Sequence, residues 1–381
     1  MKILIIANYK LDQILSVNKF TDLLATNIIN FGHQVRVIYP KPYFNCFPQI
    51  PSYIKKWLGY IDKFLLFPLQ LNKALSWADI VHVCDHGNAI YTKYLQKIPH
   101  IVTCHDLSAI RSGLGEFPEN RIGKMSRLLH RMIMQGLNNS YKVICVSEQT
   151  KSDLVRLSTL DESAISVIHM GLNYPYSPME FTDSQPIIQK LGISSNCNYI
   201  LHVGANHWYK NRLGVLSIFH QLLLKLKLTN SELTKLNLVM VGESMTDEMR
   251  DFIKTHNLTQ RVIELVGVEN KELQALYSRA TALLFPSLQE GFGWPIIEAQ
   301  ACGCPVFTSN ISPMNYIGGD AAIYINHLNH QEAAEQIIYN LPNLKILKSK
   351  SISNAQKFTS EKMIFNYIQA YQEVFEMRNK Y

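Results

Sequence analysis

The sequence lacks a long apolar run, which is what a membrane-spanning helix would require. A spanning helix needs about 20 consecutive apolar residues. The most apolar stretch of this 381-residue chain, Phe64–Leu71, is short and interrupted by Pro68. The first nine residues, MKILIIANY, are too few for a signal peptide. They predict a first buried strand.

Cysteine, low-complexity sequence and strong charge are also scarce. The seven cysteines are scattered, and Cys302 and Cys304 have the wrong spacing for a zinc knuckle or a redox pair. We therefore expect a reducing cytoplasm. Hydrophobic residues make up 47% and charged residues 18%, which excludes disordered, collagenous and coiled-coil chains. The net charge of +7 is too small to identify a partner, and no basic stripe with interleaved stacking residues suggests nucleic acid.

Short β-branched runs alternate with longer amphipathic stretches, and the alternation occurs twice. This pattern predicts parallel sheets with crossover helices. The expected fold class is α/β, with two doubly wound Rossmann-like domains facing across a cleft. The expected strands are 2–7, 34–38, 79–84, 100–104, 142–146 and 165–168, then 199–203, 236–241, 262–265, 281–285, 305–308 and 321–325. The main expected helices are 17–31, 89–96, 122–137, 148–157, 213–228, 271–279, 295–301 and 361–377.

A polar, proline-containing segment, Asn173–Gln189, separates the two series and is the expected linker. The predicted domains are residues 1–183 and 184–360. A C-terminal helix at about 361–381 can pack back on the first domain. Ligands of such sheets bind at the carboxyl ends of the strands, so the residues that follow each strand are the candidates for a site.

The segment Phe285–Ala299 is the most informative one in the sequence. A strand is followed by Glu290-Gly291-Phe292-Gly293, then by a helix that begins near Pro295 and carries Glu298 in its second turn. Glycines allow close backbone approach, and free N–H groups at a helix start bind anions. Two carboxylates flank this anion site, and a carboxylate can accept hydrogen bonds from a sugar diol. The alternative is an ordinary strand–loop–helix connection with a capping acid.

The spacing E-G-F-G-x-P-x-x-E-A from Glu290 to Ala299 resembles the signature of the retaining glycosyltransferases of family four, which have the two-domain GT-B fold. Further segments resemble the family in the same order along the chain. They are Thr103–Leu107, Val146–Lys151, His202–Asn211, Val239–Glu243, Val266–Val268 and Gly318–Ala322.

This resemblance implies roles for individual residues. Glu298 would bind the ribose hydroxyls of a nucleotide, and Glu290 would meet hydroxyls of the donor sugar. Lys210 would meet the diphosphate, and His105, from the other domain, would face the donor sugar. The expected catalytic residues are His105, Glu290 and Lys210. The other expected donor-binding residues are Gly291, Phe292, Gly293, Gly204, Asn206, Arg212, Gly242, Gly267 and Val268.

No cofactor is expected beside the donor substrate, a nucleotide diphosphate sugar linked to UDP or GDP, and no metal is expected, because Lys210 and the Gly291–Gly293 amides can take its place. The leaving diphosphate gains negative charge, which a fixed cation and a helix N-terminus stabilise. No Asp-x-Asp sequence appears. The sequence departs from the family at two places. Tyr209 occupies a position where many members have Arg, and Arg212 or Asn206 would then substitute for that Arg. The loop after the first strand contains no glycine.

Polar residues after the strands of the first domain are the acceptor-side candidates: Asp85, His86, Asn88, Asp106 and Ser147. For Asp85, His86 and Asn88, an acceptor pocket and structural hydrogen bonds are equally open. A histidine at a strand end, such as His105, is more often a satisfied hydrogen-bonder than a catalyst, but the surrounding motifs favour the functional interpretation.

Two segments combine basic and aromatic or apolar residues, Tyr53–Leu69 and Ile122–Met134. Half-buried crossover helices with solvated basic faces are the favoured interpretation. Helices that lie on an anionic membrane surface are the alternative. Whether the protein makes a peripheral contact with the inner membrane surface is therefore left undecided by the sequence.

The expectation is a cytoplasmic glycosyltransferase that moves a hexosyl unit, mannosyl or glucosyl, from the nucleotide sugar to a glycan or lipid-linked acceptor. The resemblance to family four further implies retention of the anomeric configuration and a role in bacterial surface polysaccharide assembly. One alternative is a GT-B enzyme that epimerises or hydrolyses a nucleotide sugar. Another is a catalytically degenerate partner subunit that binds nucleotide or glycan.

Overall fold

The computed structural model describes residues 1–12, 14–44, 51–194, 196–228 and 235–378. The chain forms two compact units. Met1–Asn173 and Ser360–Tyr381 form the first unit, and Tyr174–Thr359 form the second. The boundary at Asn173 precedes the predicted boundary at 183, because helix α7 (Phe181–Lys190) packs against α10 (Asn270–Arg279) inside the second unit. The expected linker is therefore largely structured.

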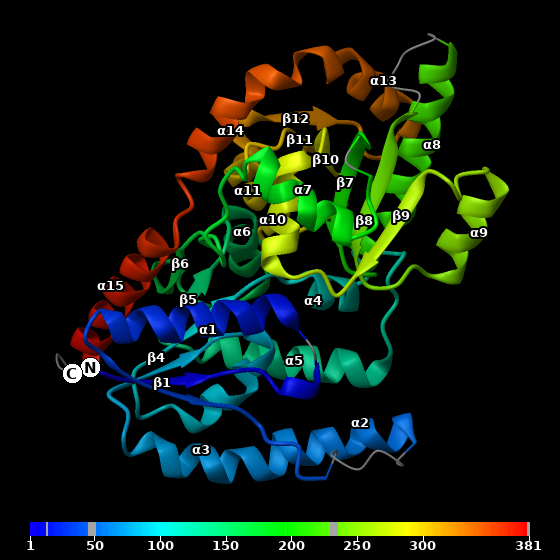
Figure 1. The fold of residues 1–381 in the computed structure, drawn as a ribbon. Coiled ribbons are helices and arrows are strands. Elements are labelled where there is room, and N and C mark those ends of the chain that lie inside the picture. The colour runs from blue at the N-terminus through cyan, green and yellow to red at the C-terminus, as the bar shows by residue number, and fades with distance from the viewer. Residues whose placement is uncertain (13, 45–50, 195, 229–234, 379–381) are drawn as a thin grey trace. The chain divides into compact units, whose positions relative to one another are not determined.

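The first unit contains a parallel six-stranded sheet in the order β2-β1-β3-β4-β5-β6 (Figure 1). Its strands are completely or largely buried at the centre, where runs such as KILII have few polar residues, as parallel strands covered on both faces require. The strands are β1 Lys2–Ile6, β2 Gln34–Ile38, β3 Ile80–Val83, β4 His100–Cys104, β5 Lys142–Cys145 and β6 Ile165–Val167.

The second unit contains another parallel six-stranded sheet, in the order β12-β11-β10-β7-β8-β9. The strands are β7 Tyr199–Gly204, β8 Asn237–Gly242, β9 Val262–Val266, β10 Ala282–Phe285, β11 Val306–Ser309 and β12 Ala322–Ile325. In both sheets the chain moves outward in two directions from a central pair, which is the doubly wound arrangement. The predicted fold class of each unit is confirmed.

Helices connect the strands in both units. In the first unit they are α1 Leu15–Asn30, α2 Ser52–Ile61, α3 Phe67–Leu75, α4 Ser108–Gly113, α5 Lys124–Asn138, α6 Glu148–Leu157 and α15 Ser360–Arg378. In the second unit they are α7, α8 Arg212–Leu228, α9 Asp247–Thr255, α10, α11 Trp294–Ala301, α12 Met314–Gly318, α13 His330–Asn340 and α14 Leu347–Ala355. Side-chain caps mark several helix starts; the Thr246 side chain, for example, accepts a hydrogen bond from the Met249 N–H at the start of α9.

The C-terminal helix α15 belongs to the first unit and packs against α1 and β4 (Figure 1). The Tyr371 hydroxyl lies 2.7 Å from Nδ1 of His82 on β3, and the Tyr367 hydroxyl lies 3.0 Å from Oγ1 of Thr103 on β4. His82 Nε2 in turn lies 2.8 Å from Thr103 Oγ1. Two strands of the first sheet are thus joined to the last helix by a buried polar network.

Two segments of the first unit are wound differently from the expected α-helices. The predicted helix at 89–96 is a 3-10 helix at His86–Tyr94, where the Thr92 hydroxyl donates to carbonyls of Ala89 and Gly136. Gly136 of α5 comes so close that a Cβ there would lie 2.1 Å from the Ala89 oxygen. The second is a π-helical turn, Asp62–Leu66, between α2 and α3. Such turns are often found at functional sites.

Candidate active site

The loop between β10 and α11 carries the donor-site candidates Glu290, Gly291, Phe292 and Gly293. Gly293 precedes the helix with a φ of 105°, a left-handed conformation that favours glycine. Pro295 stands in the first turn of α11, where its missing N–H is tolerated. The Leu288 N–H donates to the Tyr209 carbonyl at 2.8 Å, which ties this loop to the one between β7 and α8. Both loops follow strands at the carboxyl edge of the second sheet.

Lys210 and Glu290 form an ion pair between these two loops. The ammonium nitrogen of Lys210 lies 2.7 Å from Oε1 and 2.9 Å from Oε2 of Glu290. The Glu290 side chain is 7% exposed and that of Lys210 15%. The same nitrogen lies 5.2 Å from the centre of the Phe285 ring. The structure therefore brings together two of the three expected catalytic residues.

Glu298 lies on α11 and is buried, and it meets a tyrosine of α10. The Tyr277 hydroxyl donates to Oε2 of Glu298 at 2.9 Å. Burial and the Glu298 charge raise the pKa of Tyr277 well above its ordinary value, so that this hydroxyl keeps its proton and remains a donor. The contact fixes the carboxylate of Glu298.

Arg212, at the start of α8, is buried within a network that also contains Asn206. Its Nη1 donates to the side-chain oxygen of Asn206 and, at 2.8 Å, to the carbonyl of Glu243. Asn206 also donates to the Ser244 carbonyl at 2.6 Å. Nε and Nη2 of Arg212 are buried and have no hydrogen-bond partner among the described residues. Burial lowers the pKa of this guanidinium, against the opposing charges of Glu264 and Glu243.

The neighbouring candidates are glycines that let backbones approach. A Cβ at Gly242, where φ is 147°, would lie 2.1 Å from the Gly204 oxygen of the adjacent strand. A Cβ at Gly204 would lie 3.1 Å from Nε2 of His202 and 3.5 Å from Cβ of Lys210. Gly267, with a φ of 72°, directly follows β9 and leads through Val268 into the capping box of α10. Gly204 and Gly242 are the last residues of β7 and β8, so all three glycines lie at the carboxyl ends of strands of one sheet.

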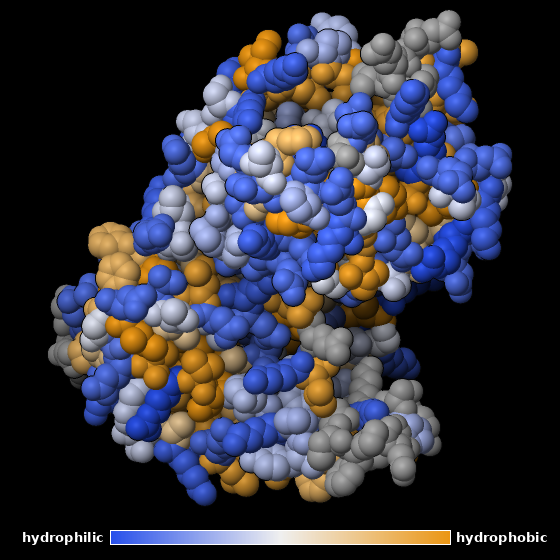
Figure 2. Space-filling model, in the orientation of Figure 1, coloured by the Kyte–Doolittle hydropathy of each residue, from blue (hydrophilic) through white to orange (hydrophobic). Residues whose placement is uncertain are grey.

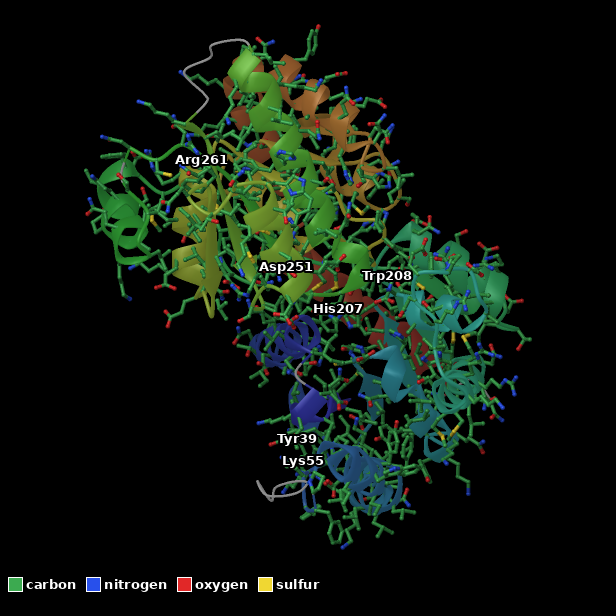
Figure 3. All side chains as sticks on the ribbon, turned by 90° about the vertical axis from the view of Figure 1, so that its right-hand side faces the viewer. Tyr39, Lys55, His207, Trp208, Asp251 and Arg261 are labelled. Carbon is green, nitrogen blue, oxygen red and sulfur yellow. The ribbon has the colours of Figure 1, made fainter. Side chains whose placement is uncertain are left out.

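Tyr209, where many family members carry Arg, has its own contacts. Its ring stacks on His207, with 5.3 Å between ring centres, and Trp208 meets it edge-on (Figure 3 labels His207 and Trp208). Its carbonyl accepts the Leu288 N–H. Tyr209 thus organises the loop that presents Lys210.

In the first unit, four polar residues after β1 and β3 form one connected cluster. Asn8 donates to Asp85 Oδ2 at 2.6 Å and accepts from Asn88 at 2.6 Å. The Gly87 N–H donates to Asp85 Oδ1 at 2.9 Å, and His86 Nδ1 lies 3.2 Å from the same oxygen. Burial alone would raise the pKa of Asp85, but the nearby His86 and His105 and these hydrogen bonds lower it. Asp85 is thus held as an anion.

His105 lies at the end of β4, beside this cluster. Its Nε2 donates to the Cys84 carbonyl at 2.8 Å, and Phe20 meets its ring edge-on. Burial lowers the pKa of His105, although the charge of Asp85 opposes the shift. The two remaining candidates lie at helix starts. Asp106 Oδ1 accepts the Ser108 N–H at 2.8 Å just before α4, and Ser147 caps α6, since its Oγ accepts the Thr150 N–H at 3.2 Å.

No group of three or more histidine, cysteine, aspartate or glutamate side chains within the described ranges is arranged to hold a metal ion. Sequence reasoning missed two contributors. Asn8 follows the first strand, in a loop that was considered only for its lack of glycine. A polar residue directly after a buried strand of such a sheet is itself an indication of a ligand site. Tyr277 lies in an ordinary helical pattern, and only the tertiary fold shows its contact with Glu298.

Two family models together match most of the chain. The model described as Glycosyltransferase Family 4 matches residues 17–174, and the one described as Glycosyl transferases group 1 matches residues 183–358. With its two doubly wound units, the protein is therefore a glycosyltransferase of the GT-B type. The chain belongs to glycosyltransferase family four, as the resemblance of the Glu290–Ala299 segment implied.

Characterised relatives and solved structures agree with this class. O-antigen chain mannosyltransferase B of Escherichia coli is 25% identical over 75% of this chain and 75% of its own length. O-antigen chain mannosyltransferase RfbU of Salmonella typhimurium is 28% identical over 64% of this chain and 61% of its own. The structure of sucrose-phosphate synthase from Thermosynechococcus elongatus superimposes with a TM-score of 0.77 at 17% identity, covering 99% of this chain and 100% of that one. Anabaena HepE, solved in complex with UDP and glucose, gives a TM-score of 0.74 at 15% identity, covering 98% and 99%.

Proposed function

We propose that this glycosyltransferase transfers a hexosyl unit from a nucleotide diphosphate sugar, with retention of the anomeric configuration. The acceptor is a glycan or a lipid-linked glycan of a bacterial surface polysaccharide. The observation that carries the proposal is the arrangement of Lys210, Glu290 and Glu298 around the glycine-led start of α11. Each group has a task in such a transfer.

The transfer breaks the bond between the anomeric carbon and the diphosphate oxygen, through a state with oxocarbenium character. The departing diphosphate gains negative charge. Lys210 and the N–H groups at the start of α11 are fixed positive groups that would stabilise that charge where it develops. An ammonium has three donors, and Glu290 uses at most two of them, so Lys210 keeps one for a phosphate oxygen. No metal is needed for this step.

The carboxylates suit the sugars at the two ends of such a donor. Glu298, held by Tyr277, would accept hydrogen bonds from the ribose hydroxyls, and Glu290 from the hydroxyls of the hexose. In the first unit, the cluster around Asp85 would bind the acceptor, and His105 would face the donor sugar. Both O-antigen relatives are mannosyltransferases by name, and HepE is described in complex with UDP-glucose. We therefore propose a mannosyl or glucosyl donor linked to GDP or UDP.

The first experiment is a thermal-shift panel with UDP, GDP and their glucose and mannose conjugates. A ligand at 100 times its dissociation constant adds about 2.7 kcal/mol to the stability of the unit that binds it. We expect one base to stabilise clearly more than the other. No stabilisation by any member of the panel would overturn the proposal. With the acceptor in hand, the NMR coupling constant at the anomeric position of the product tests retention.

Release of free nucleotide in amounts independent of every acceptor would instead indicate a hydrolase or epimerase. This outcome would refute the transferase mechanism while leaving the donor site in place. It is measured by following nucleotide release with and without extracts of surface glycan.

We also propose that the protein works in the cytoplasm, at the inner membrane surface. No helix in the described part of the chain combines the length and apolarity that a membrane crossing requires. The first unit carries Lys55 on α2 and Lys124, Arg127 and Arg131 on α5, and each cation near an anionic surface contributes about 1 kcal/mol. The side chain of Lys56 lies outside the described residues. We expect co-sedimentation with anionic liposomes at low salt and its loss at high salt; failure to sediment even at low salt would refute this localisation.

A further inference from the structure

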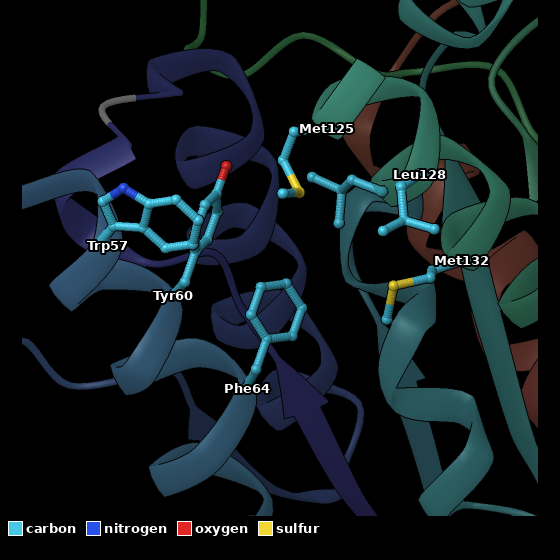
Figure 4. A pocket seen from close by; sticks show the side chains of 7 residues that line it. Trp57, Tyr60, Phe64, Met125, Leu128 and Met132 are labelled. Carbon is cyan, nitrogen blue, oxygen red and sulfur yellow. The ribbon is translucent and has the colours of Figure 1, made fainter. Parts of the chain in front are cut away.

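An apolar groove lies in the first unit between α5 and the segment formed by α2 and the π-helical turn. Figure 4 shows Trp57, Tyr60 and Phe64 on one side, facing Met125, Leu128 and Met132 on the other. The groove has a volume of about 230 Å³. Its lining residues are all apolar or aromatic.

The two walls are built differently. The aromatic wall is continuous, since Trp57 meets Tyr60 edge-on with 5.8 Å between ring centres, and Tyr60 lies 5.7 Å from Phe64. The opposite wall is formed by flexible methionines and leucines of one α5 stripe. Methionine adapts to irregular apolar ligands. A rigid wall and an adaptable wall suit a flexible hydrocarbon.

The side chains that line the groove are more exposed to solvent than residues of a hydrophobic core. Trp57 is 58% exposed, Met125 54% and Leu128 51%. Single apolar side chains lie among polar ones on the surface of both units, as Figure 2 shows, and are normal on soluble proteins. Here, however, exposed apolar residues from two helices face each other across a recess. Such a grouping marks a binding site for an apolar ligand.

The two helices that flank the groove carry only positive charges. Neither α2 nor α5 contains an acidic residue, and the one carboxylate of the π-helical turn, Asp62, is buried. Lys124, Arg127 and Arg131 of α5 alternate with the groove-lining residues, and none of these three cations forms an ion pair with a described residue. Apolar lining with flanking cations complements a lipid with an anionic head.

Both walls connect to the polar cluster around Asp85. On the aromatic side, Asp62 of the π-helical turn accepts from the Tyr9 hydroxyl at 2.9 Å, and Tyr9 follows Asn8 of the cluster. On the other side, α5 packs on the 3-10 helix that begins at His86. Burial, assisted by the charge of His86, lowers the pKa of His130 on α5. The groove and the cluster are thus parts of one assembly.

We propose that this groove binds the hydrocarbon chain of a phosphate-headed lipid that serves as the acceptor, with its phosphate at the cations of α5 beside the groove and its glycan at the Asp85 cluster. The inference rests on the proposed function, since it specifies the acceptor of that reaction. A recess favours a single chain, whereas contact with a bilayer requires only protruding side chains. The link between the groove and the cluster brings the glycan of such a lipid near the expected acceptor site.

The test uses farnesyl phosphate, a short isoprenoid phosphate, below its critical micelle concentration and without vesicles. We expect saturable binding that changes the fluorescence of Trp57, which lines the groove; a Trp57→Phe variant identifies its share of the signal among the four tryptophans. Inorganic phosphate should produce no change. Leu128→Ser, at a half-exposed position that tolerates a polar residue, should weaken binding at least tenfold.

Leu328→Ser is the matched control, because Leu328 is 75% exposed and belongs to the second unit. It should bind farnesyl phosphate like the wild type. The inference is overturned if farnesyl phosphate does not bind, if Leu128→Ser binds as well as Leu328→Ser, or if Trp57 responds only to phosphatidylglycerol vesicles. The last result would identify a bilayer contact.

Nucleotide binding separates this inference from the proposed function. Leu128→Ser should keep the wild-type thermal shift with the preferred nucleotide sugar. Nucleotide-sugar binding without farnesyl phosphate binding would refute the groove inference alone. Farnesyl phosphate binding without any nucleotide binding would refute the proposed function, and with it the acceptor role of the lipid.

Discussion

The ammonium nitrogen of Lys210 lies 2.7 Å and 2.9 Å from the two carboxylate oxygens of Glu290, so that loops from two strands of the second sheet meet in one ion pair. Lys210 ends the short helical turn after β7, and Glu290 follows β10. Because the pair is largely buried, each partner neutralises the other before any donor binds. A bound diphosphate would then add to the pair and not replace it.

Replacing Lys210 by methionine should lower kcat by about 100- to 1000-fold, the usual cost of removing one group that stabilises developing negative charge. It should also destabilise the fold by about 3–5 kcal/mol, because Glu290 is left as a buried, uncompensated charge. Steady-state kinetics and thermal unfolding measure the two effects. The Lys210→Met/Glu290→Gln double variant should recover stability but not kcat; recovery of both would show that the pair is structural.

Turnover should continue in an excess of chelator. The proposed stabilisation of the leaving diphosphate uses Lys210 and the start of α11, and neither depends on a divalent ion. Activity assays with and without EDTA decide the point. Complete loss of activity that magnesium or manganese restores would show that the diphosphate is held differently.

Glu298→Ala should weaken nucleotide binding about ten- to a hundredfold, since a hydrogen bond to a charged group contributes about 1.5–3 kcal/mol. Tyr277→Phe should have a smaller effect in the same direction, because it removes the hydroxyl that fixes the Glu298 carboxylate but leaves the carboxylate itself. Calorimetric titration with the preferred nucleotide measures both. An unchanged affinity in folded Glu298→Ala protein would contradict this assignment.

Stability should fall in acid because of the buried His82. Burial, assisted by the charge of His105, lowers the pKa of His82 to about 3, whereas an unfolded chain titrates near 6.5. Between these values the unfolded state binds a proton that the folded state does not. The free energy of unfolding should therefore be insensitive to His82 above pH 6.5 and decrease below it, by up to about 1.4 kcal/mol per pH unit.

Urea unfolding at pH 7.5, 6.0 and 5.0 measures this dependence. His82→Gln should be less stable at pH 7.5, because its contacts with Tyr371 and Thr103 change, and its stability should vary less with pH. His207→Gln, at an exposed position, is the control and should follow the wild type. Equal pH dependence in all three proteins would contradict the assignment.

The strands were the most predictable part of the fold. Each of the twelve expected strands is present, with ends that differ by a residue or so. Most are β-branched runs buried on both faces, which have few alternative structures. Helix α7 was not expected, since its sequence is polar and contains Pro186, and its stability depends on packing against α10. Local sequence carries no signal for such a contact.

Within the site, the sequence predicted residue types and loops but not their partners. Lys210 was expected to contact the diphosphate and Glu290 the donor sugar. Only the fold shows that these two residues, 80 positions apart in the sequence, form an ion pair with each other. Arg212 was a candidate substitute for the Arg that Tyr209 replaces. Its buried guanidinium is held through Nη1 by Asn206 and the Glu243 carbonyl, contacts that the sequence did not indicate. Tertiary hydrogen bonds of this kind depend on the approach of separate strand ends, which a linear pattern does not specify.

Gly242→Ala should destabilise the second unit, because Gly242 combines an unusual conformation with a close contact. Its φ of 147° is one that side chains rarely adopt, and a Cβ there would lie 2.1 Å from the Gly204 oxygen. Backbone strain of this kind costs about 1–3 kcal/mol, which corresponds to a decrease in Tm of roughly 2–12 °C for a unit of this size. Gly192→Ala is the matched control: Gly192 belongs to the same unit and has a φ of 78°, but nothing lies within 4 Å of its added Cβ. The control should lose Tm because of backbone strain alone. Gly242→Ala should lose more Tm and should also bind nucleotide more weakly, because Gly204 must move. Equal losses of Tm in the two variants, measured by calorimetry, would show that the contact between these strand ends does not hold the site together.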